Sequence, residues 1–590
     1  MSFGEKRNSK KECLIIGGLV LCVLVGITIA CPPYYSMNDD VMMKSILSGA
    51  YTGTPDGHTV YMKYPLSGII SLLYRMTGKV SWFDIVMVGC FWLSIVSVVL
   101  RIVKSRRVML IAGVVSLCFA LFLPHLLTMH YTLVAAMVGS SALFLVMTGG
   151  SVTAAVLFIL CYCIRSQVFF LLLPFLGVAV LWRIAGKKQE GLFRQLFWVA
   201  AGVVLCMLCN QVMYQGDDWK QYMDYNDART RLYDYEGLLP YEENKAIFQE
   251  AGISREQHRI MEEYVLVLDD SVTGGMQEKA ADIAAGVRES QRSAGSYLIQ
   301  CVKEYYYHMM YTDQPYNLLL ICAYLLVLVL LLRKRYWVKL LLLCCLAGGR
   351  SLIWVFLIWR GRFPERIYVS LYFLDLMILA GMIIDLLRSE SEVGKAGTDK
   401  AGTVKTGPGK TDELAKSGTD KRYKRYIPQI ISGVLIFLLL LAGYRQCREM
   451  YGRTIQQAQK QRAWEALLQY CEEHPDKLYL LDVRSMVSYT GRVWDVVQQQ
   501  ENHLLAGGWM SNSPLLMQRL EGAADGGALL ADVDEQCCYV VSVDRDIEWL
   551  QEYCNVRFGE MHLERIDRIL LDGEEIFDIY CHTEDKRNQE

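Results

Sequence analysis

Two adjacent carboxylates lie just beyond the first long apolar run of the chain. The run 13–31 is soon followed by Asp39 and Asp40, in the stretch YYSMNDDVMM. A carboxylate at the outer surface of a membrane can act as a general base or hold a divalent metal without the cost of a charge in hydrocarbon. An Asp pair before VMMKSIL is also typical of a helix N-terminus, where the helix dipole favours it. Both interpretations are open, and they are compatible.

The segment after the Asp pair is rich in glycine, tyrosine and proline. Residues 48–78 contain four polar side chains of interest, Asp56, His58, Lys63 and Tyr64. Long loops on a rigid scaffold tend to carry function. We therefore expect a structured loop with an amphipathic re-entrant helix, whose four polar residues contact a substrate.

Arginines recur in two further segments. Arg229 and Arg231 lie among tyrosines in YMDYNDARTRLYDYEGLLPYE, and Arg362 and Arg366 flank Glu365 in WRGRFPERIY. Guanidinium groups bind phosphate bidentately, and these four are our candidates for binding a phosphate. The alternatives are a Tyr and Arg belt at the membrane interface for the first pair and an internal ion pair with Glu365 for the second.

Other polar residues give weaker signals. His125 and His130 in LPHLLTMHYT have no adjacent acid, so interface histidines are the simpler interpretation than a metal site. Arg165 is expected at an outer helix end, with a substrate contact as the alternative. Motifs of nucleotide, zinc or redox chemistry do not appear in a persuasive context.

The elements that must position these residues are apolar. The chain has 590 residues, of which 53% are hydrophobic, and a mean hydropathy of +0.22. Its apolar blocks are about as long as a helix needs to cross ~30 Å of hydrocarbon. We therefore predict a polytopic α-helical membrane protein with about eleven transmembrane helices. The candidate spans are 13–30, 83–103, 108–123, 131–148, 151–164, 167–182, 195–213, 316–332, 337–359, 367–387 and 427–443.

Lys and Arg in the short loops orient these spans. With eleven spans the basic N-terminus, the basic loops after the second, sixth and eighth spans and the segment 388–426 all fall on the cytoplasmic side, as the positive-inside rule requires, whereas the arginines of 360–366 run against it. The N-terminus is then cytoplasmic, and the segments 31–82, 214–315, 360–366 and everything after 443 face outward. The net charge of −2 gives no basic balance that would indicate nucleic acid.

The soluble segments differ from one another in composition. Residues 388–426 are basic and of low complexity, so we expect a disordered cytoplasmic linker. Residues 444–590 contain the strand-like runs KLYLLDV and CCYVVSV and a helical run before them, which predicts a small extracytoplasmic α/β domain. The cysteines of this tail show no clean disulfide or zinc spacing. The remaining part, 1–387, is the predicted transmembrane core.

This layout, with NDDVMM after the first helix, resembles the GT-C class of integral membrane glycosyltransferases. The resemblance implies a sugar taken from a polyprenyl-phosphate donor and given to an extracytoplasmic glycan, polymer or lipid acceptor, with inversion. It also implies Asp39 or Asp40 as the base that activates the acceptor. On chemistry rather than a motif match, the four arginines above would bind the donor phosphate.

One departure from the family concerns its second acidic motif. The turn that often carries it reads LPHLLTMHYT here and has no acid, although Asp217, Asp218, Asp224 or Asp227 can substitute. We therefore expect no cofactor and list no metal, while leaving a divalent ion open. The sugar, the acceptor and the oligomeric state are not given by the sequence.

Two other functions compete with transfer of a sugar. A transporter or flippase for a lipid-linked glycan would use broken helices and mid-membrane polar groups, for which the short fifth and sixth spans and Arg350 are the hints. A non-catalytic envelope scaffold would tolerate the loss of either aspartate. All three interpretations place the chain in the plasma membrane, in contact with lipids and without nucleic acid.

Overall fold

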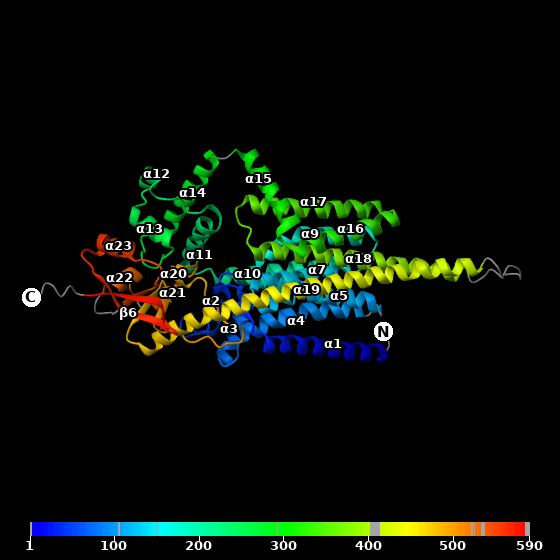
Figure 1. Ribbon diagram of the computed structural model, residues 1–590, viewed down its shortest axis with the longest axis horizontal. Helices are drawn as coiled ribbons and strands as arrows, with labels where there is room; N and C mark the ends of the chain where they lie inside the picture. Colours follow the sequence, from blue (N-terminus) through cyan, green and yellow to red (C-terminus); the bar gives the residue numbers. More distant parts are fainter. Residues whose placement is uncertain are drawn as a thin grey trace, which may run out of the picture.

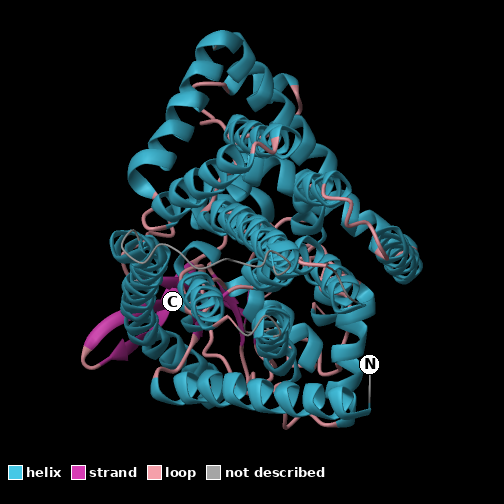
Figure 2. Cartoon of the chain, turned by 90° about the vertical axis from the view of Figure 1, so that its right-hand side faces the viewer, coloured by secondary structure: helices cyan, strands magenta, loops and turns pink. Residues whose placement is uncertain are grey.

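The computed structural model describes residues 3–103, 107–149, 152–291, 293–401, 414–520, 523, 525–532 and 537–583. Long helices form a bundle that occupies most of its length, and shorter elements gather at the end where the C-terminus lies (Figure 1). In Figure 2, which views the bundle from its other end, the strands lie behind the helices.

Eight helices of the described chain are long and apolar enough to cross a membrane. Each consists of about 20 residues of high hydropathy, which matches the hydrocarbon thickness. They are α1 (Phe3–Ala30), α4 (Trp82–Val103), α5 (Val108–Leu121) with α6 (Pro124–Leu127), α9 (Ser166–Ala185), α10 (Leu192–Met213), α16 (Tyr316–Lys334), α17 (Trp337–Trp359) and the first part of α18 (Glu365–Ala401).

Two shorter apolar helices, α7 (Tyr131–Met147) and α8 (Val152–Ile164), complete the bundle. Every residue of α7 is buried, and α4, α8, α9 and α18 pack around it. Small residues allow this close packing: a Cβ at Gly139 of α7 would lie 2.9 Å from the Cys161 sulfur of α8. The central position of α7 explains why a helix of this length is apolar on all sides.

The multi-pass helical fold is as predicted, whereas the count of eleven spans stays a prediction. The last predicted span, 427–443, lies within α19 (Leu414–Glu473), a single helix that continues well past it. Figure 1 shows α19 running along the bundle and into the C-terminal part. The boundary expected at 443 is therefore absent from the backbone.

The segment 388–426, predicted as a disordered linker, includes the ends of two helices. Helix α18 extends to Ala401 and α19 begins at Leu414, so 388–401 and 414–426 are helical, while 402–413 lie outside the described residues. A helix that is already formed extends at low cost, because each added residue gains a hydrogen bond without a new nucleation step.

The end of the bundle where the C-terminus lies carries shorter helices from the segments 31–82 and 214–315, for which we keep the names first outer loop and large outer loop from the predicted topology. The first outer loop contributes a short strand, β1 (Tyr34–Tyr35), which pairs in parallel with β2 (Thr128–Met129). Its helices are α2 (Asn38–Ser48) and α3 (Tyr64–Met76). The large outer loop forms α11 (Asp217–Thr230), α12 (Lys245–Glu250), α13 (Arg255–Glu263), α14 (Gly274–Gln291) and α15 (Ala294–Tyr307), with π-helical turns at Arg231–Glu236 and His308–Thr312.

The C-terminal part contains a five-stranded mixed sheet with the order β4-β3-β5-β7-β6. Strands β4, β3 and β5 run parallel to one another, and β7 is antiparallel to both of its neighbours, β5 and β6. The strands are β3 (Leu478–Leu481), β4 (His503–Leu505), β5 (Cys537–Ser542), β6 (Leu563–Leu571) and β7 (Glu574–His582). The helices are α20 (Val483–Met486), α21 (Pro514–Arg519), α22 (Gly526–Ala531) and α23 (Glu548–Phe558).

Both faces of this sheet are covered, one by the end of α19 and the other by the large outer loop. Tyr479 and Leu481 of β3 pack against the end of α19, whereas Leu480 between them packs in a core shared with 265–268 of the large outer loop. This alternation is the period of two that a strand requires. The sheet and the large outer loop therefore form one unit with a common core, rather than a separate domain.

Two adjacent strands of the sheet are joined covalently. Cys538 of β5 and Cys581 of β7 are directly opposite in the antiparallel register and form a disulfide. Sequence spacing gave no such pairing, because the register that brings the two residues together comes from the sheet. A disulfide is typical of an oxidising compartment.

Candidate functional site

The two aspartates lie in the first turn of α2 and have different surroundings. Residues next to each other on a helix point about 100° apart. Asp40 is fully buried, and its Oδ1 accepts a hydrogen bond of 2.9 Å from the backbone N–H of Tyr131, at the start of α7. Its Oδ2 is buried without a partner among the described residues. Burial raises the pKa of Asp40 well above its ordinary value, and the charge of Asp39 adds to this effect.

Asp39 faces positive charge instead. Burial raises the pKa of Asp39, while three guanidinium groups, those of Arg366, Arg165 and Arg229, oppose this rise. Within the described part of the chain, the Asp39 carboxylate has no hydrogen bond or ion pair of its own. A partly buried carboxylate in this setting is available to a ligand. We call Asp39 and these three arginines the Asp39 site.

Two of the three arginines have no carboxylate partner among the described residues. Arg165 precedes α9, and its guanidinium lies 4.8 Å from the ring centre of Tyr61 and 5.3 Å from that of Tyr131. Its Nη1 is buried without a partner among the described residues. Among the described residues, the acceptor for Arg366 is a sulfur, the Sδ of Met37 at 2.8 Å from its Nη1. Both are free to bind an anion.

The third arginine is held more firmly. Arg229 is buried in α11, where it donates to the Tyr264 hydroxyl at 2.7 Å and to Asn226 Oδ1 at 3.0 Å. These bonds leave its positive charge without a carboxylate partner. Arg229 therefore contributes mainly its field to the site.

The other two predicted arginines are engaged elsewhere. Arg231 forms ion pairs with Glu278 and with Asp282, the latter at 2.7 Å. Arg362 forms an ion pair of 2.5 Å with Asp234. The sequence could not reveal these partners of Arg231, because they lie on α14, far along the chain. Both guanidinium groups are neutralised by protein carboxylates, and neither belongs to the Asp39 site.

The four residues of the predicted substrate loop also separate into one near the Asp39 site and others that are bound elsewhere. Lys63 lies near Arg165 and Asp227, and burial together with the charge of Arg165 lowers its pKa. His58 bonds Asp56 Oδ1 at 2.7 Å and the Met213 carbonyl at 3.1 Å, and its ring stacks on Trp219 at 4.4 Å. Both ring nitrogens of His58 are therefore occupied.

Asp56 and His58 thus fasten the first loop to the junction of α10 and α11. Tyr64 has a similar position, since its backbone N–H donates to Asn210 Oδ1 and its ring packs on Gly57 and Gly68. Of the four predicted loop residues, only Lys63 lies in the field of the Asp39 site.

The two histidines also separate. His125 bonds the Tyr316 hydroxyl at 2.8 Å and is a buried structural residue. His130 caps α7 by accepting from the backbone N–H of Thr132, while its Nε2 is buried without a partner in the described chain. Burial lowers the pKa of His130 well below its ordinary value, and the positive charges of Arg366 and Arg165 lower it further. His130 therefore borders the Asp39 site, which its position in the sequence did not reveal.

A second carboxylate, which sequence reasoning missed, positions α2. Asp84, at the start of α4, is fully buried and binds Lys44 of α2 at 2.8 Å. It also accepts hydrogen bonds from the hydroxyls of Tyr35 and Ser81 and, at 3.0 Å, from the backbone N–H of Trp494. This cluster joins α2, α4 and the C-terminal part at one point.

The segment 491–495 of the C-terminal part closes over the first outer loop. The Tyr35 N–H donates to the Gly491 carbonyl at 3.0 Å, and the Val493 N–H donates to the Pro33 carbonyl at 2.9 Å. Lys44 also donates to the Asp495 carbonyl at 2.6 Å. The helix that carries Asp39 is therefore fixed from two sides.

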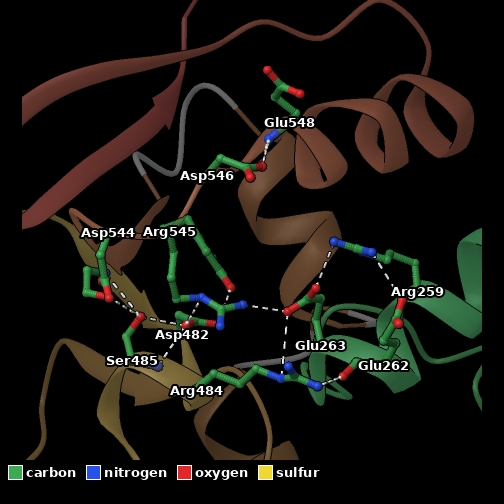
Figure 3. A network of polar contacts seen from close by, with 12 residues as sticks. Arg259, Glu262, Glu263, Asp482, Arg484, Ser485, Asp544, Arg545, Asp546 and Glu548 are labelled. Carbon is green, nitrogen blue, oxygen red and sulfur yellow. Dashed lines mark hydrogen bonds and ion pairs between the residues drawn. The ribbon is translucent and has the colours of Figure 1, made fainter. Parts of the chain in front are cut away.

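Ion pairs hold the large outer loop to the C-terminal part (Figure 3). Glu263 of α13 lies between two arginines of the C-terminal part, with Arg545 at 2.5 Å and Arg484 at 3.8 Å, and pairs with Arg259 of its own helix at 2.9 Å. Arg545 also reaches Asp482 at 3.3 Å. The loop that carries Arg229 is thus attached to the same body that fixes α2.

A group of potential metal ligands lies elsewhere in the structure. Among the described residues, one set of three potential ligands converges, Asp269, Asp270 and Asp525. That set joins the large outer loop to the C-terminal part, and Arg557 already forms ion pairs with all three. Positive charge at Asp39 comes from arginines instead.

Comparison with known proteins adds one solved structure. No protein-family model and no curated protein matches the chain. The chain is similar in structure to ArnT from Cupriavidus metallidurans bound to undecaprenyl phosphate, with 11% sequence identity, a TM-score of 0.39 and coverage of 98% of each chain. We therefore base the function on the side chains of this chain.

Proposed function

We propose that the chain is a membrane glycosyltransferase of the GT-C type, which moves a sugar from a polyprenyl-phosphate donor to an acceptor on the outer side. The observation that carries this proposal is the Asp39 carboxylate, which is partly buried, has no hydrogen bond or ion pair to the described residues and lies in the electrostatic field of Arg366, Arg165 and Arg229. A base next to anion-binding groups is the arrangement that this reaction requires.

Each group has a role in the transfer. The donor phosphate binds Arg165 and Arg366, whose free N–H groups match its oxygens, in the field of Arg229. Asp39 takes the proton of an acceptor hydroxyl, whose oxygen then bonds to the anomeric carbon. The bond from that carbon to the phosphate oxygen breaks, and its electron pair stays on the polyprenyl phosphate. Attack from the face opposite the phosphate inverts the anomeric centre.

The location of the site supports a lipid donor. Asp39 follows α1, an apolar helix long enough to cross a membrane, after a short connection. A headgroup in the outer leaflet would reach the site from the bilayer. The disulfide between Cys538 and Cys581, in the unit that packs over the site, favours the outer side for this end of the bundle.

The structure weakens the main hint of a transporter. Arg350 of α17 pairs with Asp375 of α18 at 2.5 Å and with the Tyr305 hydroxyl at 3.1 Å. Its charge at membrane depth is therefore compensated within the protein, as polar groups inside a bundle usually are. Arg350 needs no transported ligand to explain it.

Label transfer from a panel of radiolabelled polyprenyl-phosphate sugars tests the proposal, with the protein reconstituted in bilayers. Asp39→Asn should lower turnover by about 100- to 10,000-fold, the usual contribution of a general base. Asp217→Asn is the matched control, because its fully exposed carboxylate lies on α11 away from the site. Equal turnover by wild type and Asp39→Asn would refute the role of Asp39, and absence of turnover across the panel would refute the donor class.

A further inference from the structure

One helix of the large outer loop leaves most of its surface uncovered. Helix α15 (Ala294–Tyr307) packs against α17, and Figure 1 shows it beside the end of that helix. All 14 residues of α15 are described, and Cys301 alone among them is buried. Most of the stability of a helix in a protein comes from the packing of its apolar face, so α15 needs a further surface to pack against.

The side chains of α15 form three rows, in which the members lie four residues apart and therefore share a face. One row is packed against α17, a second is polar and exposed, and a third is apolar and exposed. Neighbouring residues point about 100° apart, so the polar and the apolar row lie on either side of the packed one. The rows are, in this order, Tyr297, Cys301 and Tyr305; Ser296, Gln300 and Glu304; and Leu298, Val302 and Tyr306.

Two tyrosines of the packed row hold α15 beside the last turns of α17. The Tyr297 hydroxyl donates to the Trp359 carbonyl at 3.1 Å, and the two rings are 4.9 Å apart. The hydroxyls of Tyr305 and Ser351 are hydrogen-bonded at 2.7 Å. Ser351 and Trp359 are about 12 Å apart along α17, at 1.5 Å per residue.

The stretch of α17 between these two contacts faces lipid. Helix α17 is long and apolar enough to cross a membrane. Leu352 and Phe356 lie between Ser351 and Trp359 and are 73% and 59% exposed. Uncovered side chains of a spanning helix lie in hydrocarbon, where apolar groups are favoured. Because α15 lies beside this stretch, its own uncovered apolar row continues the same surface.

Length and charge exclude α15 as a further spanning helix. Its 14 residues reach about 21 Å, which is less than the ~30 Å of hydrocarbon. Glu304 of the polar row and the neighbouring Lys303 are exposed charges, whereas Ile299, beside the apolar row, is 59% exposed. An exposed apolar face together with an exposed charged face is typical of a helix that lies in the plane of a membrane interface.

We propose that α15 lies in the bilayer leaflet at this end of the bundle, with its apolar row among the acyl chains and its polar row toward headgroups and water. The large outer loop, predicted to face outward as a whole, is then anchored in the membrane at its last helix. The inference rests on α15 and α17 alone, so it does not depend on a reaction at the Asp39 site.

Photo-crosslinking in the full chain tests this placement. p-Benzoylphenylalanine, which bonds to nearby C–H groups under ultraviolet light, replaces one residue at a time in protein held in nanodiscs of phosphatidylethanolamine and phosphatidylglycerol. Val302 and Gln300 are the matched pair, because both are exposed and they belong to different rows of one helix. Leu352 is the lipid-facing reference. Ile247 of α12, exposed and apolar but away from the bundle in Figure 1, is the reference for a surface in water.

Mass spectrometry of the lipid adducts decides the outcome. We expect the yield at Val302 to lie within about twofold of that at Leu352 and to exceed the yields at Gln300 and Ile247 about tenfold. Equal yields at Val302 and Ile247 would overturn the proposal. So would adducts at Val302 with a second copy of the chain in place of lipid, which would assign the apolar row to a dimer.

A pair of charge variants gives an independent readout. Val302→Glu places a carboxylate among acyl chains and should lower the melting temperature in nanodiscs, whereas Gln300→Glu should leave it unchanged. On a helix that faces water, both changes would be close to neutral, because both residues are exposed. Equal melting temperatures for the two variants would therefore contradict burial of the apolar row in the bilayer.

Discussion

Asp84 and the pair Asp39 and Asp40 lie at the same end of the bundle, and these carboxylates differ in how many hydrogen bonds they accept. Asp84 accepts from four groups, those of Tyr35, Ser81, Lys44 and Trp494. Asp40 has one bond, and Asp39 has none within the described chain. A carboxylate whose hydrogen-bonding positions are occupied fixes structure, whereas one with open positions can react or bind a ligand.

The Asp84 cluster also explains how a pair of carboxylates with so few hydrogen bonds can persist. Leaving a buried carboxylate without partners is costly, and the surrounding structure must compensate. Asp84 provides that compensation by holding α2 through Lys44. The Asp84 cluster thus keeps Asp39 and Asp40 in place.

The largest effect should come from breaking the Asp84 cluster. Asp84→Asn leaves the Lys44 ammonium buried without its counter-charge, and we expect a loss of about 3–5 kcal/mol in the free energy of unfolding. Chemical denaturation in detergent measures it. Adding Lys44→Met to this variant should recover part of the loss; no recovery would show that the ion pair is not what stabilises the cluster.

A smaller effect of opposite sign is expected at Asp40. Its pKa is raised in the folded chain, so its contribution to stability is full below the unfolded value near 3.8 and is lost as the pH rises through the folded value. Asp40→Asn removes this loss and should stabilise the protein by about 1–3 kcal/mol at neutral pH, with less gain in acid.

Thermal unfolding of wild type and Asp40→Asn across this pH range measures the difference. Asp217→Asn, whose carboxylate is exposed, should show no such pH-dependent gain. Destabilisation by Asp40→Asn at neutral pH would place Asp40 with Asp84 as a structural carboxylate.

The smallest effect concerns the arginines and sharpens the contrast between free and paired groups. Arg366→Lys keeps the charge but loses the guanidinium fork, so the KM for the lipid donor should rise about tenfold. Arg231→Lys is the matched control, because its charge is already paired with Glu278 and Asp282. Equal rises in both variants would mean that pairing does not decide which arginine binds the donor.

The sequence predicted the parts of the site that depend on local pattern. An apolar run followed by an Asp pair indicated the start of α2, and the arginines around Glu365 drew attention to Arg366. It did not predict Asp84, whose Trp494 partner is 410 residues away. Nor could it tell Arg229 from Arg231, since only the folded chain brings α14 beside the second of them.

The contact between the first outer loop and the segment 491–495 has a consequence for how the protein is made. Lys44 and Asp495 are separated by 451 residues, so at ~5–20 residues per second the earlier residue waits roughly 20–90 s for its partner during synthesis. Throughout that interval the loop is already synthesised but lacks this contact. The first outer loop is therefore synthesised early but is among the last regions to reach its final structure. A chain that terminates before residue 495 leaves this loop without its partner.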